Sequence, residues 1–169
     1  MKKVLSMVLA LALLSMSAVA LADTYGLGVF SVVDSHSKAA TAEAAGNAQA
    51  DTTVCAVVLD AEGKIAAVHF DVVQAKIAVN EKGEIVSELG TEFKTKRELG
   101  DDYNMRPASP IGKEVDEQMD ALEAWCIGKT VEDAVTKANS GEDADLLAGC
   151  TIHVDAFMAA LTKAAANAK

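Results

Sequence analysis

Short apolar runs separated by glycine-containing turns fill the first half of the chain, which predicts β-strands there. Thr24–Val33 is expected to form a first strand, and Thr52–Leu59 a second one with apolar side chains on both faces. Apolar residues on both faces indicate a central strand that is covered on both sides. Between these strands, residues 34–51 are polar and rich in alanine, and their pattern fits either a loop or a short helix.

Two turns of similar composition connect the second strand to the strands that follow. Asp60–Lys64 and Asn80–Glu84 each place a glycine where a hairpin needs a positive φ. The strand after the first turn is expected over Ile65–Val73. One of its faces is apolar at Ala66, Val68, Phe70 and Val72. The second turn joins a strand that ends near Val79 to one near Ile85, so the pattern predicts an antiparallel meander.

Apolar residues recur at helical spacing in the second half of the chain. Residues 93–105 are charged and interrupted by glycine, and they show no clear period. Ser109 and Pro110 are expected to begin the first long helix, as its cap and its first residue, and Gly128 to end it. Its apolar stripe is expected at Ile111, Val115, Met119, Leu122 and Cys126.

Two further helices are expected before the chain ends. Thr130 with Asp133 resembles a capping box, which predicts a short helix over residues 131–138, followed by an acidic loop over residues 139–145. The last helix is expected directly after Thr151. Its apolar stripe is Val154, Phe157, Met158 and Leu161. Strands that precede helices along the chain predict an α+β fold, in which C-terminal helices pack against an antiparallel β-meander sheet.

The first 22 residues have the composition of a secretory signal peptide. Lys2 and Lys3 form a basic start, an apolar stretch follows, and Ala20–Ala22 offers small residues for cleavage before Asp23. The apolar run is too short for a stable transmembrane helix, and no later segment is apolar enough to span a bilayer. We therefore expect one domain over residues 23–169, secreted, periplasmic or on the exterior of the cell envelope.

Charge and cysteine content narrow the classes of partner. The chain has a formal net charge of −10, and loss of Lys2 and Lys3 with the signal peptide makes it more acidic. Its negative charge repels nucleic acids and anionic membranes, which are therefore unfavourable as partners. Its three cysteines, Cys55, Cys126 and Cys150, cannot all pair within one chain because their number is odd. The simplest interpretation is three small, buried apolar residues.

The run from Asp145 to Thr151 is the one segment whose composition predicts a specific chemical site. A hydroxyl just before a helix usually caps it, and either Thr151 or Asp155 could satisfy an amide of the last helix. The same place also suits a phosphate, because helix N-termini present free N–H groups and a partial positive charge. Gly149 would allow the backbone to approach a ligand closely.

This run resembles the flavin-attachment motif of secreted FMN-binding domains, Asp-x-x-(Ser/Thr)-Gly-Ala-(Thr/Ser). The resemblance implies that Thr151 carries FMN through a phosphoester bond, and that a separate flavin transferase delivers the FMN from FAD. It further implies that Asp145 positions the reaction or is recognised by that transferase. Two positions depart from the motif, since Ala148 replaces Ser or Thr and Cys150 replaces Ala.

Shorter segments support the resemblance in the same order along the chain. Glu98–Asp101 resembles the Gly-Leu-Gly-Asp loop of flavin-carrying subunits of ion-pumping electron-transfer complexes, and Trp125 with Gly128–Lys129 resembles their Trp…Gly-Lys spacing. The resemblance implies an apolar cover for the isoalloxazine ring from Leu99, Met105 and Trp125. The expected cofactor-binding residues are Thr151, Asp145, Gly149, Cys150, Leu99, Gly100 and Trp125.

The resemblance implies an exported FMN-binding electron carrier that meets redox partner proteins at the cell envelope. Ala148 and Cys150 favour an alternative, a non-flavin binding or structural module on the same scaffold. A third hypothesis is a metal-dependent enzyme, because His69 with Asp71 and a second His-x-Asp pair near Thr151 could bind a metal if they came together. Surface or edge residues without a partner are the simpler explanation of the two pairs. No Ser/His/Asp or Cys/His arrangement has a supporting local signature.

Overall fold

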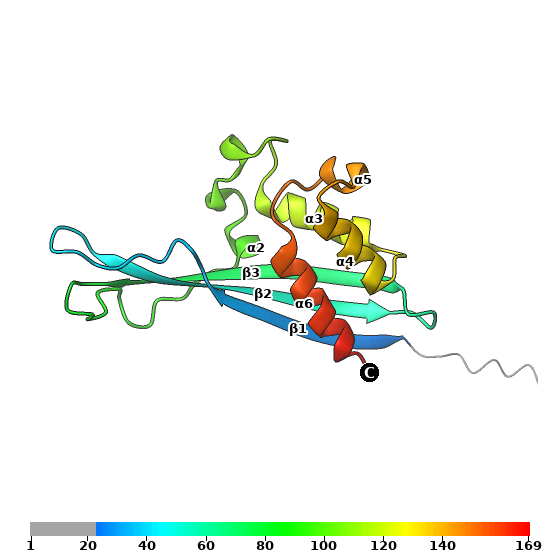
Figure 1. Ribbon diagram of the computed structural model, residues 1–169, viewed down its shortest axis with the longest axis horizontal. Coiled ribbons are helices and arrows are strands. Elements are labelled where there is room, and N and C mark those ends of the chain that lie inside the picture. Colours follow the sequence, from blue (N-terminus) through cyan, green and yellow to red (C-terminus); the bar gives the residue numbers. More distant parts are fainter. Residues whose placement is uncertain (1–22) are drawn as a thin grey trace, which may run out of the picture.

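Residues 23–169 are described by a computed structural model, and the predicted signal peptide lies outside this described part. They form a three-stranded antiparallel sheet with helices packed on one of its two faces (Figure 1). The expected α+β fold, a meander followed by C-terminal helices, is therefore confirmed. No helix within residues 23–169 is long and apolar enough to cross a membrane.

The sheet has the order β1-β2-β3, so each strand pairs with its neighbour along the chain. β1 spans Thr24–Val33, β2 spans Gly46–Leu59 and β3 spans Ile65–Val79. The first strand has its expected bounds. The ambiguous residues 34–51 form a loop and then the first part of β2, which pairs with the end of β3.

Both predicted turns are present. Gly63 and Gly83 adopt positive φ values of 76° and 79°, as the hairpin geometry requires. After the second turn the chain contacts β3 through two isolated bridges, Val79 with Ile85 and Val73 with Thr95, and forms no continuous strand there. The meander therefore ends with β3, and the strand expected near Ile85 does not form.

The prediction for one face of β3 is wrong at its first residue. The pairing of β2 and β3 shifts register between Val58 and Leu59, which places Ile65 in the core and leaves Ala66 exposed. A register shift of this kind turns the following side chains to the opposite face. The other three expected core residues of this strand, Val68, Phe70 and Val72, are buried.

The helical layer consists of seven elements. They are α2 (Lys96–Leu99), η1 (Gly100–Tyr103), η2 (Arg106–Ala108), α3 (Val115–Cys126), α4 (Val131–Ser140), α5 (Ala144–Leu147) and α6 (Asp155–Ala166). Residues 93–105, which have no clear period, thus contain α2 and η1. The acidic loop expected over residues 139–145 is shorter, because α4 and α5 take up both of its ends.

The predicted start of the long helix is wrong. Ser109 and Pro110 do not begin it; α3 starts after Glu114, whose carboxylate forms a capping box with the first turn. Gly112 has a φ of 63°, which ends any helix that would run from Pro110. Ile111 therefore lies outside α3. The remaining expected positions, Val115, Met119, Leu122 and Cys126, are buried.

Of the caps predicted for the last two long helices, only that of α4 is observed. The hydroxyl of Thr130 accepts a hydrogen bond from the backbone N–H of Asp133 at 3.2 Å, so the predicted start of α4 is confirmed. α6 begins at Asp155 rather than directly after Thr151, and its cap Val154 offers no side-chain hydrogen bond. Neither expected capping residue caps this helix.

α6 lies directly on β1 and β2 (Figure 1). Gly26 and Gly28 of β1 make this possible, because a Cβ atom at either position would lie 2.0 Å from a carbonyl oxygen of α6. The two oxygens belong to Ala164 and Ala160. The helix backbone thus rests on the strand backbone, with alanines facing glycines.

The core between the sheet and the helices contains the three thiols. Phe70 of β3 meets Phe157 of α6 edge to face, with ring centroids 5.4 Å apart. Cys55, Cys126 and Cys150 are buried and unpaired, as the simplest interpretation expects. Burial raises the pKa of both Cys55 and Cys126 to about 12, so these thiols stay neutral in the folded protein.

Side chains from the helical layer cover both edges of the sheet. On β1, the ammonium group of Lys163 donates to the carbonyl of Val29 at 2.9 Å. On β3, the backbone N–H of Phe70 donates to Glu123 at 2.7 Å, and the carbonyl of Phe70 accepts from Arg97 Nε at 2.7 Å. These contacts occupy backbone groups that an additional strand would need.

The contact between β1 and α6 predicts a large cost for a single methyl group. Gly28→Ala should lower the free energy of unfolding by about 1–3 kcal/mol, because the new Cβ must displace the α6 backbone. Urea denaturation followed by circular dichroism measures this change. Lys76→Ala, at an exposed position of β3, serves as the control and should stay within about 0.5 kcal/mol of the wild type. Equal stability of Gly28→Ala and the wild type would contradict the close backbone contact.

Candidate functional site

Thr151 lies in the connection between α5 and α6, and its polar groups are engaged by α3. Its backbone N–H and its hydroxyl both donate to Oε1 of Gln118, at 2.9 and 3.2 Å. The side chain of Thr151 is half-buried. The hydroxyl singled out from the sequence is thus held in place by a glutamine of another helix.

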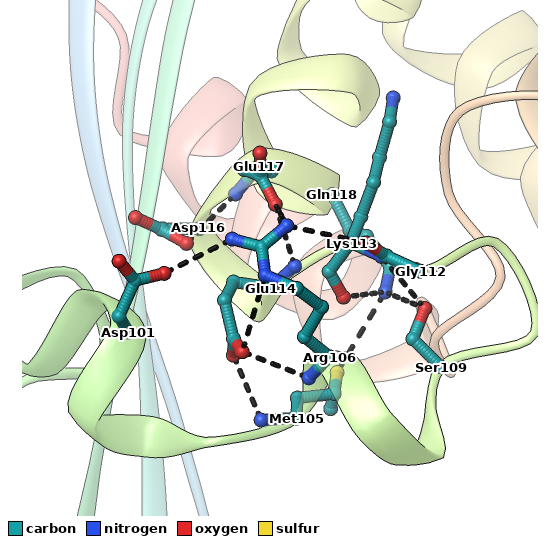
Figure 2. Close-up of polar contacts among 10 residues, drawn as sticks. All are labelled: Asp101, Met105, Arg106, Ser109, Gly112, Lys113, Glu114, Asp116, Glu117 and Gln118. Atoms are coloured by element: carbon teal, nitrogen blue, oxygen red, sulfur yellow. Dashed lines mark hydrogen bonds and ion pairs between the residues drawn. The ribbon is translucent and has the colours of Figure 1, made fainter.

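Gln118 is fully buried and connects three segments of the chain. Its amide nitrogen donates to the hydroxyl of Ser109 and to the carbonyl of Lys113, both at 3.2 Å, and lies 3.7 Å from the sulfur of Met105. Figure 2 shows these contacts at the start of α3. Because its oxygen accepts from Thr151, one side chain holds the segment before α3 and the segment before α6 together.

Glu114 fixes the same segment from the other side (Figure 2). Its two carboxylate oxygens accept the backbone N–H groups of Met105 and Arg106, each at 2.8 Å. The guanidinium of Arg106 in turn binds Asp101 at 3.0 Å and Glu117 at 2.8 Å. Hydrogen bonds to a charged acceptor are stronger than neutral ones, so the chain around η2 is firmly attached to α3.

The other residues of the predicted attachment motif do not surround Thr151 as a ligand site would. Asp145 and Ala148 are exposed, and Cys150 is buried in the core. Gly149 packs against α3, because a Cβ atom there would lie 2.8 Å from the Cβ of Ala121. The glycine thus serves close helix packing, a role that its place in the motif did not indicate.

A hollow of about 260 Å³ lies beside Thr151, between α4, α5 and the start of α6. Its lining includes the carboxylates Asp143 and Asp155, and His153, but no lysine or arginine. Hydrogen bonds from the backbone N–H of Leu146 hold the pKa of Asp143 below its ordinary value, so this group is charged at neutral pH. Two carboxylates repel a phosphate, and the residues here therefore fit the phosphate of FMN poorly.

A larger groove of about 470 Å³ lies on the helix-covered side of the sheet, where the strands continue past α6 (Figure 1). Its apolar part is formed by Val72, Val115, Met105, Ile152 and Phe157. Its polar part follows farther along the strands, because Asp51 pairs with Gln74 beyond the row that contains Val72. Tyr103 and Lys96 form the wall opposite α6.

The polar part of the groove is organised by a chain of hydrogen bonds. The hydroxyl of Tyr103 donates to Gln74 at 3.2 Å, and Gln74 donates to one oxygen of Asp51 at 2.9 Å. The other oxygen of Asp51 accepts from Gln49 at 3.0 Å. The ammonium group of Lys96 lies 4.8 Å from the centre of the Tyr103 ring. These contacts fix an aromatic ring, a cation and a carboxylate in one hollow.

The expected ring cover is brought together only in part. Met105 lines the groove, whereas Leu99, Gly100 and Trp125 line neither hollow. The indole of Trp125 donates to Asp143 at 3.1 Å, and Lys129 lies over its ring at 4.3 Å. The tryptophan is therefore engaged at the α5 side of the molecule, away from the groove.

Sequence reasoning missed the residues that form the polar part of the groove. Asp51, Gln74, Lys96 and Tyr103 come from four different elements and share no motif spacing. The signal that could have found them is strand register: Asp51 and Gln74 are cross-strand partners on the same side of the sheet. That pairing requires the full length of β2 and β3, which the sequence pattern underestimated.

Comparisons with known proteins found no relative of this chain. No protein-family model, curated protein or solved structure matches it.

Within residues 23–169, no group of three or more His, Cys, Asp or Glu side chains is arranged to hold a metal ion. The two His-x-Asp pairs are separated, since His69 lies on the sheet while His153 lies beside α6.

The network around Thr151 predicts unequal costs for its two partners. Gln118→Leu should lower the free energy of unfolding by about 1–3 kcal/mol, because half-buried groups of Thr151 and Ser109 lose their hydrogen-bond partner. Thr151→Val removes a single hydroxyl bond and should cost less, about 1 kcal/mol. Urea denaturation of both variants measures the difference. A Gln118→Leu variant as stable as the wild type would show that this network does not stabilise the fold.

Proposed function

We propose that the protein is an exported binding protein that holds a small planar ligand, without a covalent bond, in the groove between β2, β3 and α6. Flavin is the candidate ligand. The observation that carries the proposal is the groove itself, which combines an apolar part with a polar part built from Tyr103, Gln74 and Asp51. Its volume of about 470 Å³ lies within the range of about 300–1,000 Å³ that is usual for small-molecule sites.

The chemistry of the lining supports a ring system with one apolar and one polar end. Phe157 and Val72 offer an apolar contact surface, and Tyr103 offers an aromatic face at the opposite wall. Lys96 has no carboxylate partner within the described residues, so it is available to a polar ring edge. An isoalloxazine has this division, with a dimethylbenzene end and a pyrimidine end. A bound flavin would supply electron transfer, which agrees with the resemblance of the sequence to FMN-binding domains.

Titration with flavins tests the proposal. Riboflavin and FMN should both bind, because the ring system makes the expected contacts, and flavin fluorescence or equilibrium dialysis measures the affinity. Tyr103→Ala should raise the dissociation constant about 10-fold, since it removes the aromatic wall and the hydrogen bond to Gln74.

Tyr25→Ala is the matched control, because Tyr25 is the only other tyrosine and lies on the opposite face of the sheet. It should leave flavin affinity unchanged. The absence of binding for both riboflavin and FMN, or equal losses in the two tyrosine variants, would argue against a flavin site in the groove.

Covalent attachment of FMN to Thr151 is the second candidate. One observation favours it: Ile152 and His153, which follow Thr151 directly, line both the hollow beside Thr151 and the groove. Co-expression with a flavin transferase, followed by intact-mass measurement, should then give a protein heavier by one FMN group. Thr151→Val should abolish the increase, while Thr130→Val, at a helix cap, should keep it. An unmodified mass in the presence of an active transferase would leave the non-covalent site as the function.

A further inference from the structure

Within residues 23–169, the face of the sheet opposite the helices is uncovered, and its centre is apolar. Figure 1 shows the helices of residues 23–169 on one side only. We call the other side the open face; its centre consists of Tyr25, Leu27 and Val29 on β1 and Val54, Ala56 and Val58 on β2. Tyr25, Leu27 and Val29 are 65%, 60% and 45% exposed. Contiguous apolar surface of this kind on an exported domain indicates a contact with another molecule.

The polar side chains of the open face are already satisfied within the chain. Ser31 and Thr52 share a hydrogen bond of 2.8 Å. Asp71 accepts backbone N–H groups of Val72 and Arg97 at 2.8 and 3.3 Å. His69 also lies on this face and contacts Glu123 at 3.2 Å, and Asp71 is the one acidic residue of β1, β2 and β3 that points to this side. An occupant of this face must be apolar and does not need to be basic.

The edges of the sheet exclude one way of covering this surface. The carbonyl of Val29 is bound by Lys163, and both backbone groups of Phe70 are bound by Glu123 and Arg97. At the end of β1, the backbone of Tyr25 pairs with that of Lys169, in both directions. An additional strand cannot extend the sheet along these positions, so an occupant has to stack on the open face.

The dimensions of the open face suit a second sheet. β1 has 10 residues, and three strands of this length cover about 34 Å by 14 Å, or roughly 480 Å² in projection. The combined area of two such faces approaches the roughly 1,000 Å² of buried surface that a specific protein interface needs. This projected area does not include the additional surface of the protruding side chains. Both hollows described above lie on the helix side, and the open face carries neither of them.

We propose that the open face is the interface of a homodimer, in which two copies of this chain stack sheet on sheet about a two-fold axis. A second copy supplies a matching partner: a surface of equal size with the same apolar centre. Sheets that pack in this way keep their strands within about 30° of each other, with about 10 Å between them. A two-fold axis places the same residues on both sides of the contact.

Sedimentation equilibrium of the full chain, expressed with its own leader and purified from the host, tests the dimer. The wild type should show a concentration-dependent mass up to twice that of the monomer. Leu27→Glu should raise the dissociation constant at least about 100-fold, because the two-fold axis brings a carboxylate from each copy into the interface. Ile127→Glu is the matched control: Ile127 is 46% exposed in the loop after α3, and its substitution should leave the dimer intact.

A second measurement needs no substitution. The chain has two tyrosines, and hydroxyl-radical footprinting should show protection of Tyr25 as the protein concentration rises, while Tyr103 in the groove keeps a constant rate. This result decides the question if the Leu27→Glu variant fails to fold. A monomer at every concentration, a dimer without protection of Tyr25, or protection of Tyr25 only by phosphatidylcholine vesicles would each overturn the proposal. Flavin titration of the groove is independent of this outcome.

Discussion

The architecture depends on the direct backbone contact between β1 and α6. Gly26 and Gly28 have no side chains, so the helix descends onto the strand until its carbonyl oxygens reach the strand surface. At this distance from the sheet, Phe157 of α6 reaches Phe70 of β3 across the core. The position of the whole helical layer follows, because α6 contacts both β1 and β2 while α3 covers β3. A helix held farther away would leave the core of a three-stranded sheet open to water.

The groove exists because this layer is shorter than the sheet beneath it. The strands continue past the start of α6, and the segment around η1 and η2 stands over them as a second wall (Figure 1). Gln118 binds Thr151 before α6 and Ser109 after η2. One buried amide therefore fixes the position of one wall of the groove relative to the other. Glu114 reinforces the second wall through Met105 and Arg106. Thr151, for which the sequence resemblance implies flavin attachment, thus helps to support the groove through Gln118.

Local patterns predicted the elements well, and tertiary contacts explain where they did not. The strand Thr24–Val33 and the two glycine turns depend on neighbouring residues alone, and both were predicted correctly. The start of α3 was not, because Glu114 draws two amides of a preceding segment onto the helix end, a contact between elements that spacing does not reveal. The exposure of Ala66 was not predicted either, because it results from the register shift between β2 and β3 beside Leu59, which is also a contact between elements. The lining of the groove depends on the register of long strands and was therefore out of reach, apart from Met105.

The reactivity of the three thiols depends on whether the chain is folded, because all three are buried in the core. An unfolded chain exposes its three thiols, and an oxidant can then join them in wrong pairs. Once Cys55 and Cys126 are enclosed, burial keeps them protonated and unreactive. The thiols are thus protected only when the core is complete. The three strands pair with their neighbours in the chain, but the core closes only when α6, the last helix, packs on β1, the first strand. Enclosure of the thiols therefore depends on a contact between the two ends of the described chain.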